Sequence, residues 1–237
     1  MFPARLAVSC CLSIVLFSNS VVSAQIGLSG STWRVNAPAR SLKDLRDRNV
    51  VKQRFDFSCG AAALATIVRY GLGAVVTERE ILTELFGLLS DDERLVVGKT
   101  GFSLLHLQRV AQARGYSAEG FRIGPDQLPL LGGPVIVYIE PRGYKHFAVL
   151  RGIDGDRVFL ADPSRGNIRL RLDTFLESWR QANGTGIIFI VERPGATPGG
   201  KSALDLTDRG RPLPEIMTAR ELLAIGNLLA RPVQSSR

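Results

Sequence analysis

The spacing of apolar residues changes near Gly115, and no other feature of the chain constrains its fold as strongly. Before this point the apolar residues recur at the helical period, and helices are predicted at 59–71, 78–89 and 103–114. After it come short runs of β-forming residues, predicted as strands at 116–122, 134–140, 146–153, 156–161, 167–171 and 186–192, with one helix at 172–182. Helices followed by an antiparallel sheet indicate an α+β domain.

The N-terminus has the pattern of a secretory signal peptide. Residues 1–24 contain one cation, Arg5, then an apolar run from Leu6 to Phe17, and they end in Val22-Ser23-Ala24. We expect cleavage after Ala24 and export, with a periplasmic location. The alternative is a retained membrane anchor, but the apolar run has about a dozen residues where a membrane-spanning helix needs about 20.

Composition divides the remaining sequence into four segments. Residues 25–50 are polar and mixed, as in a lead-in segment, and residues 51–193 carry the predicted helices and strands of one domain. Residues 194–214 are rich in proline, glycine and charge, which is typical of a linker. Residues 215–237 form a tail whose first part, 215–231, has helical character.

The charge distribution argues against nucleic acid as a partner. The formal net charge is +8, but the basic residues are spread along the chain without an aromatic-rich basic block. The surplus does permit peripheral association with an anionic membrane face. After removal of the signal peptide, one cysteine and two histidines at spacings of 47 and 40 residues match no zinc pattern, so we expect neither a metal nor another cofactor.

Cys59 is the cysteine that remains once the signal peptide, with Cys10 and Cys11, has been removed. A lone thiol is unusual in an exported protein, because thiols in oxidising compartments are commonly paired. Cys59 precedes an alanine-rich stretch that indicates a helix start, where the helix dipole favours a thiolate. It is therefore the candidate nucleophile, and the alternative is a buried structural cysteine.

A thiol nucleophile needs a base, and the chain offers two histidines. His106 falls inside a predicted helix and is interpreted as structural, whereas His146 opens a strand. The turn at Asp154-Gly155-Asp156 folds the next strand back, which places Asp162 beside the imidazole as its orienting group. Gln53, shortly before the nucleophile, is the candidate oxyanion donor. Each residue alone has a structural explanation, such as a turn former or a surface amide, and their joint spacing favours a catalytic site.

Three segments carry these residues: QRFDFSCGAAALA at 53–65, KHFAVL at 145–150 and ADPSRG at 161–166. Together they resemble the C39 peptidases, papain-like cysteine peptidases that remove double-glycine leader peptides. The resemblance covers about residues 50–193 and implies a papain-like fold, in which N-terminal helices pack on an antiparallel sheet. It further implies Cys59 as nucleophile, His146 as base, Asp162 as orienting acid and Gln53 as oxyanion donor.

The chain departs from the family pattern in two respects. Ser58 stands where the family often has an acidic residue, and nothing in the chain encodes membrane spans or an ATPase. The chain is therefore similar to stand-alone exported members, including those that accompany functional-amyloid secretion systems in Gram-negative bacteria. This resemblance implies a secreted polypeptide substrate and, as further partners, components of a secretion system.

The expected activity is hydrolysis of a peptide bond, after a Gly-Gly type leader or elsewhere in a secreted polypeptide. Two alternatives are a non-catalytic C39-like docking module and a papain-like amidase that acts on cell-wall peptides. The tail adds a further hypothesis, because residues 217–226 resemble a double-glycine leader until Asn227 and Leu228 replace the two glycines. The tail is either an autoinhibitor in the leader groove or an amphipathic helix packed on the domain or on a partner.

Overall fold

The computed structural model describes residues 41–195, 201–208, 211–212 and 217, which belong to one compact unit that begins at Ser41. The predicted signal peptide and all of the C-terminal tail except Met217 lie outside the described residues. The unit begins before the predicted domain start at Val51, because helix α1 (Leu42–Asp47) packs against strand β5 (Gly166–Arg171). The contact is tight: a Cβ on Gly166, whose φ is +87°, would lie 2.5 Å from the carbonyl oxygen of Arg46.

Further helical segments follow α1 and include the three that the sequence predicts. They are α2 (Cys59–Thr66), the π-helical turn η1 (Ile67–Gly71), α3 (Glu78–Gly87), α4 (Asp91–Thr100) and α5 (Leu104–Ala113). The predicted helix at 59–71 is thus an α-helix that ends in a π turn. Helices α1 and α4 were not predicted, although Ser90 and Glu93 form a capping box at the start of α4 that the sequence displays.

The second half of the domain is a six-stranded antiparallel sheet in the order β1-β6-β2-β3-β4-β5. The other strands are β1 (Ser117–Ile123), β2 (Val135–Ile139), β3 (His146–Asp154), β4 (Arg157–Asp162) and β6 (Gly186–Glu192). The connecting helices are η2 (Pro125–Leu130), η3 (Pro141–Gly143) and α6 (Leu172–Trp179), and β7 (Thr207–Asp208) pairs separately with β8 (Arg211–Pro212). The six predicted strands are all present, which confirms the α+β class.

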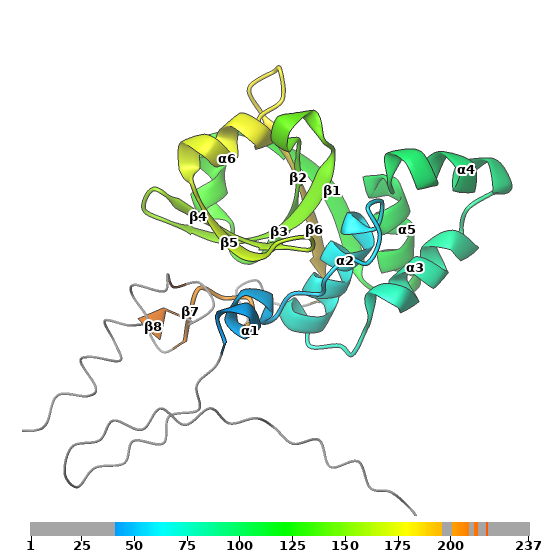
Figure 1. Cartoon of the computed structure of the whole chain (residues 1–237), viewed down its shortest axis with the longest axis horizontal. Helices are drawn as coiled ribbons and strands as arrows, with labels where there is room; N and C mark the ends of the chain where they lie inside the picture. Colours follow the sequence, from blue (N-terminus) through cyan, green and yellow to red (C-terminus); the bar gives the residue numbers. More distant parts are fainter. Residues whose placement is uncertain (1–40, 196–200, 209–210, 213–216, 218–237) are drawn as a thin grey trace, which may run out of the picture. The chain divides into compact units, whose positions relative to one another are not determined.

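The sheet carries an apolar core on each face, with α2, α3 and α5 on one side and α6 on the other (Figure 1). In β3, Phe147 and Val149 belong to the core on the α2 side, whereas Ala148 belongs to the core on the α6 side. Phe175 and Trp179 of α6 are fully buried in that second core. This alternation is the period of two that a strand shows when both faces of its sheet are covered.

Helix α2 packs against α3 and α5 and against β3 of the sheet, and its eight residues are all buried. Its alanines allow this, because small side chains let helix and sheet backbones approach closely. The space is nearly filled: a Cβ on Gly60 would lie 3.2 Å from the ring of Phe147 and 3.3 Å from Leu107. The burial of α2 therefore fixes the position of Cys59, its first residue.

Residues 201–206, which we call the strap, pack on the domain although they fall within the predicted linker at 194–214. Leu204 is fully buried in the core shared with α2. The buried guanidinium of Arg151 donates from Nε to the carbonyl of Leu204 at 2.8 Å and from Nη2 to the carbonyl of Asp205 at 3.0 Å. The strap is therefore part of the folded domain rather than a free connection.

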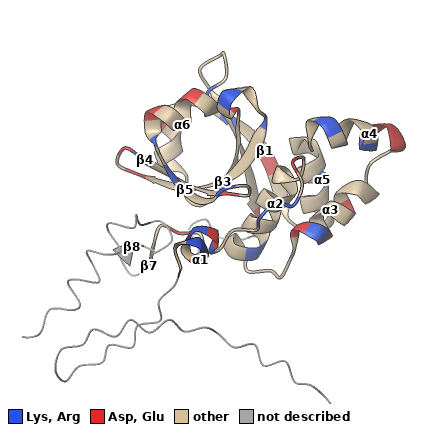
Figure 2. Cartoon of the chain, viewed as in Figure 1, with Lys and Arg blue, Asp and Glu red and all other residues tan. Residues whose placement is uncertain are grey.

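Helices α1, α3 and α4 each carry both basic and acidic residues (Figure 2). Some of them form local ion pairs, such as Arg94 with Asp91 at 3.0 Å and Lys43 with Asp47 at 3.7 Å. These helices therefore present mixed charge rather than a basic face. Within the described residues, no helix combines the length and the apolar character needed to cross a bilayer.

Candidate active site

Cys59 begins α2, and its side chain is nearly buried, with 7% of its surface exposed. A serine in the N-cap position usually bonds a first-turn amide of the helix through its hydroxyl. Ser58 occupies that position but makes no such bond. The first-turn amides of α2 thus have no side-chain cap from Ser58, and they supply positive potential beside the thiol.

The hairpin of β3 and β4 brings His146 and Asp162 together. His146 begins β3 and Asp162 ends β4, and the antiparallel register places Val149 opposite Ala161. Nε2 of His146 lies 3.2 Å from Oδ1 of Asp162. The thiol of Cys59 lies near enough to the same ring to help raise the pKa of the imidazole.

The Asp162 carboxylate is fully buried and is bound through both oxygens. Oδ1 also accepts hydrogen bonds from Ser164 N at 2.8 Å, Ser164 Oγ at 2.9 Å and Arg165 N at 3.0 Å, and Oδ2 accepts one from Arg165 Nε at 3.0 Å. Burial alone would raise the pKa of this carboxyl, but the bonds and charges of His146 and Arg165 bring the pKa well below its ordinary value. Asp162 is therefore an anion that holds the imidazole.

The environment of His146 favours the protonated ring. Burial lowers its pKa, but the hydrogen bond with Asp162 and the interactions with Asp162 and Cys59 outweigh burial and raise the pKa to about 9. At neutral pH the ring is therefore a cation near the thiol. This is the electrostatic arrangement that stabilises a thiolate nucleophile.

Gln53 lies in the loop before α2 and is tied to the end of β4. Its backbone nitrogen donates to the carbonyl of Pro163 at 3.0 Å, and its side-chain Nε2 donates to the carbonyl of Phe55 at 3.0 Å. Its Oε1 is buried and has no hydrogen-bond partner among the described residues. The loop is thus brought to the Asp162 side of the site, but no hydrogen bond joins Gln53 to Cys59 or His146 in the described part of the chain.

Glu78 is a residue near the nucleophile that the sequence analysis did not single out. It begins α3 and is only 4% exposed. Its Oε1 accepts hydrogen bonds from the backbone nitrogen of Arg54 at 2.8 Å and from Oγ of Ser58 at 2.6 Å. The sequence displays an acid in the first turn of a helix, which is an ordinary start signal and does not distinguish Glu78 from the exposed Glu80.

His106 does not join the catalytic cluster. Its Nδ1 accepts a hydrogen bond from the backbone nitrogen of Ser103 at 3.1 Å, at the start of α5, and its ring packs edge-on against Phe102. Burial lowers the pKa of this histidine, which favours the neutral ring. Among the described residues, no three His, Cys, Asp or Glu side chains gather as they would to hold a metal ion.

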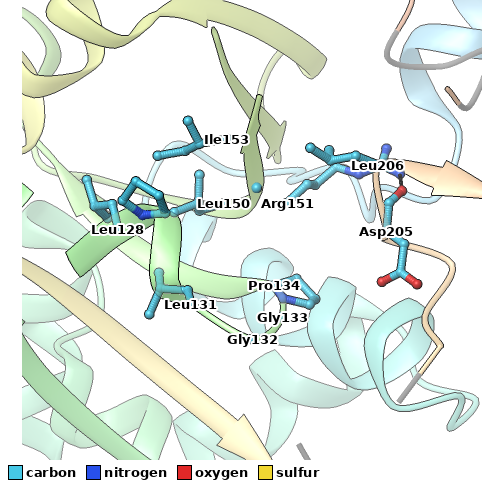
Figure 3. A pocket seen from close by; sticks show the side chains of 12 residues that line it. Leu128, Leu131, Gly132, Gly133, Pro134, Leu150, Arg151, Ile153, Asp205 and Leu206 are labelled. Carbon is cyan, nitrogen blue, oxygen red and sulfur yellow. Dashed lines mark hydrogen bonds between the residues drawn. The ribbon is translucent and has the colours of Figure 1, made fainter. Parts of the chain in front are cut away.

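A cavity of about 220 Å³ lies at the end of β3 opposite to His146. Figure 3 shows Arg151, Asp205 and Leu206 on one side of it, where the strap meets β3. The remaining lining residues are Leu128, Pro129, Leu131, Gly132, Gly133, Pro134, Leu150, Gly152 and Ile153. None of the proposed catalytic residues lines this cavity, so it is separate from the site.

Residues 47–193, more than half of the chain, match the Peptidase C39 family. The chain belongs to the Peptidase C39 family. The C39 fold and the cysteine peptidase class that the three motifs predict are thereby confirmed at the level of the family. The matched range contains Gln53, Cys59, His146 and Asp162.

This C39 chain is similar to two proteins named probable functional amyloid protease FapD. The one from Pseudomonas fluorescens is 42% identical over 151 residues, which cover 64% of this chain and 63% of that protein. The one from Pseudomonas aeruginosa is 38% identical over 187 residues, which cover 78% of this chain and 74% of that protein. The chain thus spans under two thirds of the first relative and about three quarters of the second.

Among solved structures, the chain is similar to the peptidase domain of Streptococcus ComA, a bifunctional ABC transporter involved in quorum sensing. The TM-score is 0.50 at 17% sequence identity, and the match covers 61% of this chain and 97% of that domain. At this identity the likeness concerns the fold alone. It agrees with a C39 peptidase domain in which helices pack on an antiparallel sheet.

Proposed function

We propose that the chain is an exported cysteine peptidase that cleaves a secreted polypeptide, after a Gly-Gly pair. The observation that carries the proposal is the pairing of His146 with buried Asp162, whose Oδ1 lies 3.2 Å from Nε2 of the imidazole, together with the influence of the Cys59 thiol on the same ring. This is the order of nucleophile, base and orienting acid that acyl transfer by a thiol requires.

Acylation begins from the ion pair of the Cys59 thiolate and the His146 imidazolium. The sulfur attacks the carbonyl carbon of the scissile bond, and a C–S bond forms as the carbonyl oxygen becomes an anion. The imidazolium then gives its proton to the leaving nitrogen, and the C–N bond breaks. The products of this step are a thioester on Cys59, a free amine and a neutral imidazole.

Deacylation uses the same imidazole as a base. His146 takes a proton from water, and the hydroxide attacks the thioester carbonyl, which releases a carboxylic acid and regenerates the thiolate. Asp162 stabilises the imidazolium in both halves of the cycle. In both tetrahedral intermediates the backbone N–H of Cys59 and the second Nε2 hydrogen of Gln53 are the proposed donors to the oxyanion.

The proposed substrate class rests on the relatives. Two relatives carry the name probable functional amyloid protease, which supports an exported amyloid-type polypeptide as the substrate and the components of its secretion system as partners. A Gly-Gly specificity requires a narrow slot that excludes side chains on the acyl side of the scissile bond. We propose the periplasm as the location, because residues 1–24 have the pattern of a signal peptide.

Two other functions remain as alternatives. A non-catalytic docking module would bind the polypeptide without cutting it, but such a module has no need of a cationic imidazole against a thiol. A papain-like amidase would act on cell-wall peptides through the same cluster of residues. The substrate, rather than the geometry of the site, separates this second alternative from the proposal.

The decisive experiment exposes the purified chain from Gln25 onward to exported polypeptides encoded near its gene and to purified cell-wall peptides. Mass spectrometry should find one new terminus after a Gly-Gly pair with the wild type and none with Cys59→Ala. His106→Ala serves as the matched control, because this histidine lies outside the catalytic cluster. Cleavage that persists in Cys59→Ala, or cleavage of the cell-wall peptides alone, would contradict the proposal.

The location is tested separately in the producing cell. The signal-peptide proposal expects the mature protein in the periplasmic fraction with Gln25 as its first residue. An uncleaved chain in the membrane fraction would favour the retained anchor instead.

A further inference from the structure

We propose that Glu78 is a positioning residue for the oxyanion side of the active site. Its buried carboxylate holds the loop between Gln53 and Cys59, and through this loop it sets the place of the Gln53 amide. The inference rests on the proposed peptidase function, because a carbonyl substrate is what creates the oxyanion. It concerns a residue that the catalytic steps above do not use.

Glu78 binds both ends of the loop with a single oxygen. Oε1 accepts from the backbone nitrogen of Arg54, directly after Gln53, and from Oγ of Ser58, directly before Cys59. Oγ of Ser58 lies 2.6 Å from Oε1 of Glu78 and 2.8 Å from the carbonyl oxygen of Phe55, and we assign its single hydrogen to the shorter contact with the carboxylate. A carboxylate that is 4% exposed is costly to bury, and these two charge-assisted bonds offset that cost.

Ser58 extends this anchor to the side chain of Gln53. Oγ of Ser58 accepts from the backbone nitrogen of Phe55 at 3.1 Å, and the Ser58 backbone nitrogen donates to the carbonyl of Phe55 at 3.1 Å. The same carbonyl accepts from Nε2 of Gln53 at 3.0 Å. A continuous set of hydrogen bonds therefore runs from Glu78 through Ser58 and Phe55 to the proposed oxyanion donor.

The anchor has a second consequence for the start of α2. A serine in this position is a good helix cap, and a capping hydroxyl would occupy one of the first-turn amides. Glu78 takes the Ser58 hydroxyl instead, and the helix starts without a side-chain cap. The Ser58 hydroxyl thus contributes to the anchor of the loop rather than to the start of α2.

The test separates oxyanion stabilisation from thiol reactivity with two probes. Iodoacetamide alkylates a thiolate by displacement of iodide and forms no oxyanion. A short peptide ending in glycinal adds reversibly to the thiolate, and its carbonyl oxygen then needs the oxyanion donors. Its affinity is read as the protection that it gives Cys59 against iodoacetamide, so the readout does not depend on knowing the natural substrate.

We expect Glu78→Ala to weaken aldehyde protection and to lower kcat on a Gly-Gly peptide by roughly tenfold or more, while KM and the alkylation rate stay within about twofold. Glu78→Gln should stay within about threefold of the wild type, because its amide oxygen can accept both hydrogen bonds. In a Gln53→Ala background, Glu78→Ala should add little, because both substitutions remove the same donor.

Glu80→Ala is the matched control for helix stability. Glu80 forms the capping box of α3 with Thr77 and lies in the same first turn, but it is exposed, and its hydrogen bonds in the described part of the chain go to Thr77 rather than to the loop. We expect a lower melting temperature with unchanged aldehyde protection. If Glu78→Ala does not fold, Ser58→Ala interrupts the same set of hydrogen bonds and should weaken protection in the same direction.

Three results would overturn the inference. The first is an unchanged aldehyde affinity in both Glu78→Ala and Ser58→Ala. The second is a loss of aldehyde protection that is matched by an equal loss of alkylation rate. The third is a double variant of Glu78→Ala and Gln53→Ala whose loss of aldehyde affinity, as a free energy, equals the sum of the two single losses. A wild type that binds the aldehyde but cleaves no Gly-Gly peptide would contradict the proposed substrate and leave this comparison intact. The two proposals therefore fail separately.

Discussion

Nε2 of His146 lies 3.2 Å from Oδ1 of Asp162, although sixteen residues separate them along the chain. The hairpin of β3 and β4 creates this contact, because its antiparallel strands place the first residue of β3 beside the last residue of β4. The carboxylate is fully buried, so solvent screens its charge little. The resulting stabilisation of the imidazolium is the property from which most of the behaviour of the site follows.

The first prediction concerns the dependence of activity on pH. The pKa of His146 is about 9 in the folded chain, so kcat/KM should fall as the pH rises through about 9 and the ion pair loses its cation. A pH–rate profile of the wild type on a Gly-Gly peptide measures this limb. A limb near 6.5, the ordinary histidine value, would show that Asp162 does not support the imidazolium.

The raised pKa of His146 also predicts that the free energy of unfolding depends on pH. Because the pKa of His146 is raised on folding, its contribution is fully present below pH 6.5 and is lost as the pH rises through about 9. Asp162 acts in the opposite direction: its pKa is lowered, so its contribution is present above pH 3.8 and is lost as the pH falls further. Urea midpoints of the wild type and His146→Ala should therefore converge between pH 7 and 10.

The second prediction is that Asp162→Asn folds but loses at least about 100-fold in kcat, because a neutral amide does not stabilise the imidazolium. The alkaline limb should also move below 9. Asp173→Asn makes the same chemical change at an exposed position on α6, and it should leave kcat and the alkaline limb of the pH–rate profile unaltered. A fully active Asp162→Asn enzyme would make this residue structural only.

The third prediction concerns the reactivity of the thiol. Cys59 should react with iodoacetamide near neutral pH faster than a free cysteine, because the imidazolium and the start of α2 both favour thiolate. His146→Ala should slow the reaction by roughly tenfold. His106→Ala should not, since this ring is engaged at the start of α5. Equal rates in the wild type and His146→Ala would remove the ion pair from the mechanism.

The local sequence pattern predicts much of the fold correctly. The change of period near Gly115 separates helices from strands, and the turn at 154–156 predicts which strands are paired. Helix α4 is missed because Leu95 and Val96 are exposed, so its apolar residues do not follow the core-facing period. Helix α1 has one buried residue, Leu45, and is held mainly by its contact with β5, which no local pattern reveals.

The candidate site shows the same division between local and tertiary information. His146 and Asp162 lie on neighbouring strands of one hairpin, so spacing along the chain is enough to pair them. The bond between Ser58 and Glu78 joins residues on different elements, and it depends on how α3 packs beside the start of α2. The strap is hidden for a similar reason, because a single apolar residue, Leu204, provides its burial.

The fourth prediction tests the burial of the strap. Leu204→Ala should lower the free energy of unfolding by about 2–5 kcal/mol, the usual cost of truncating a fully buried leucine. Leu130→Ala is the matched control, because this leucine is 80% exposed and its loss should cost under about 0.5 kcal/mol. Urea denaturation measures both variants. Equal urea midpoints for the wild type and Leu204→Ala would mean that the strap does not pack in the core in solution.

The fifth prediction compares two truncations of the C-terminal region. A chain that ends after Pro194 loses Leu204 and the carbonyls that Arg151 binds, so it should be less stable than a chain that ends after Pro212 by about 2 kcal/mol or more. The longer chain keeps the strap, and its behaviour therefore reports on the tail alone. Indistinguishable stabilities of the two chains would contradict the assignment of the strap to the domain.

The chain that ends after Pro212 also decides between the two hypotheses for the tail at 215–231. This tail lies outside the described residues apart from Met217. An autoinhibitor requires the chain ending after Pro212 to cleave a leader peptide faster than the full chain, and a synthetic 215–231 peptide to reverse the gain. A packing helix requires equal activity and a lower melting temperature. The truncation after Pro194 cannot make this distinction, because removal of Leu204 would alter stability and activity together.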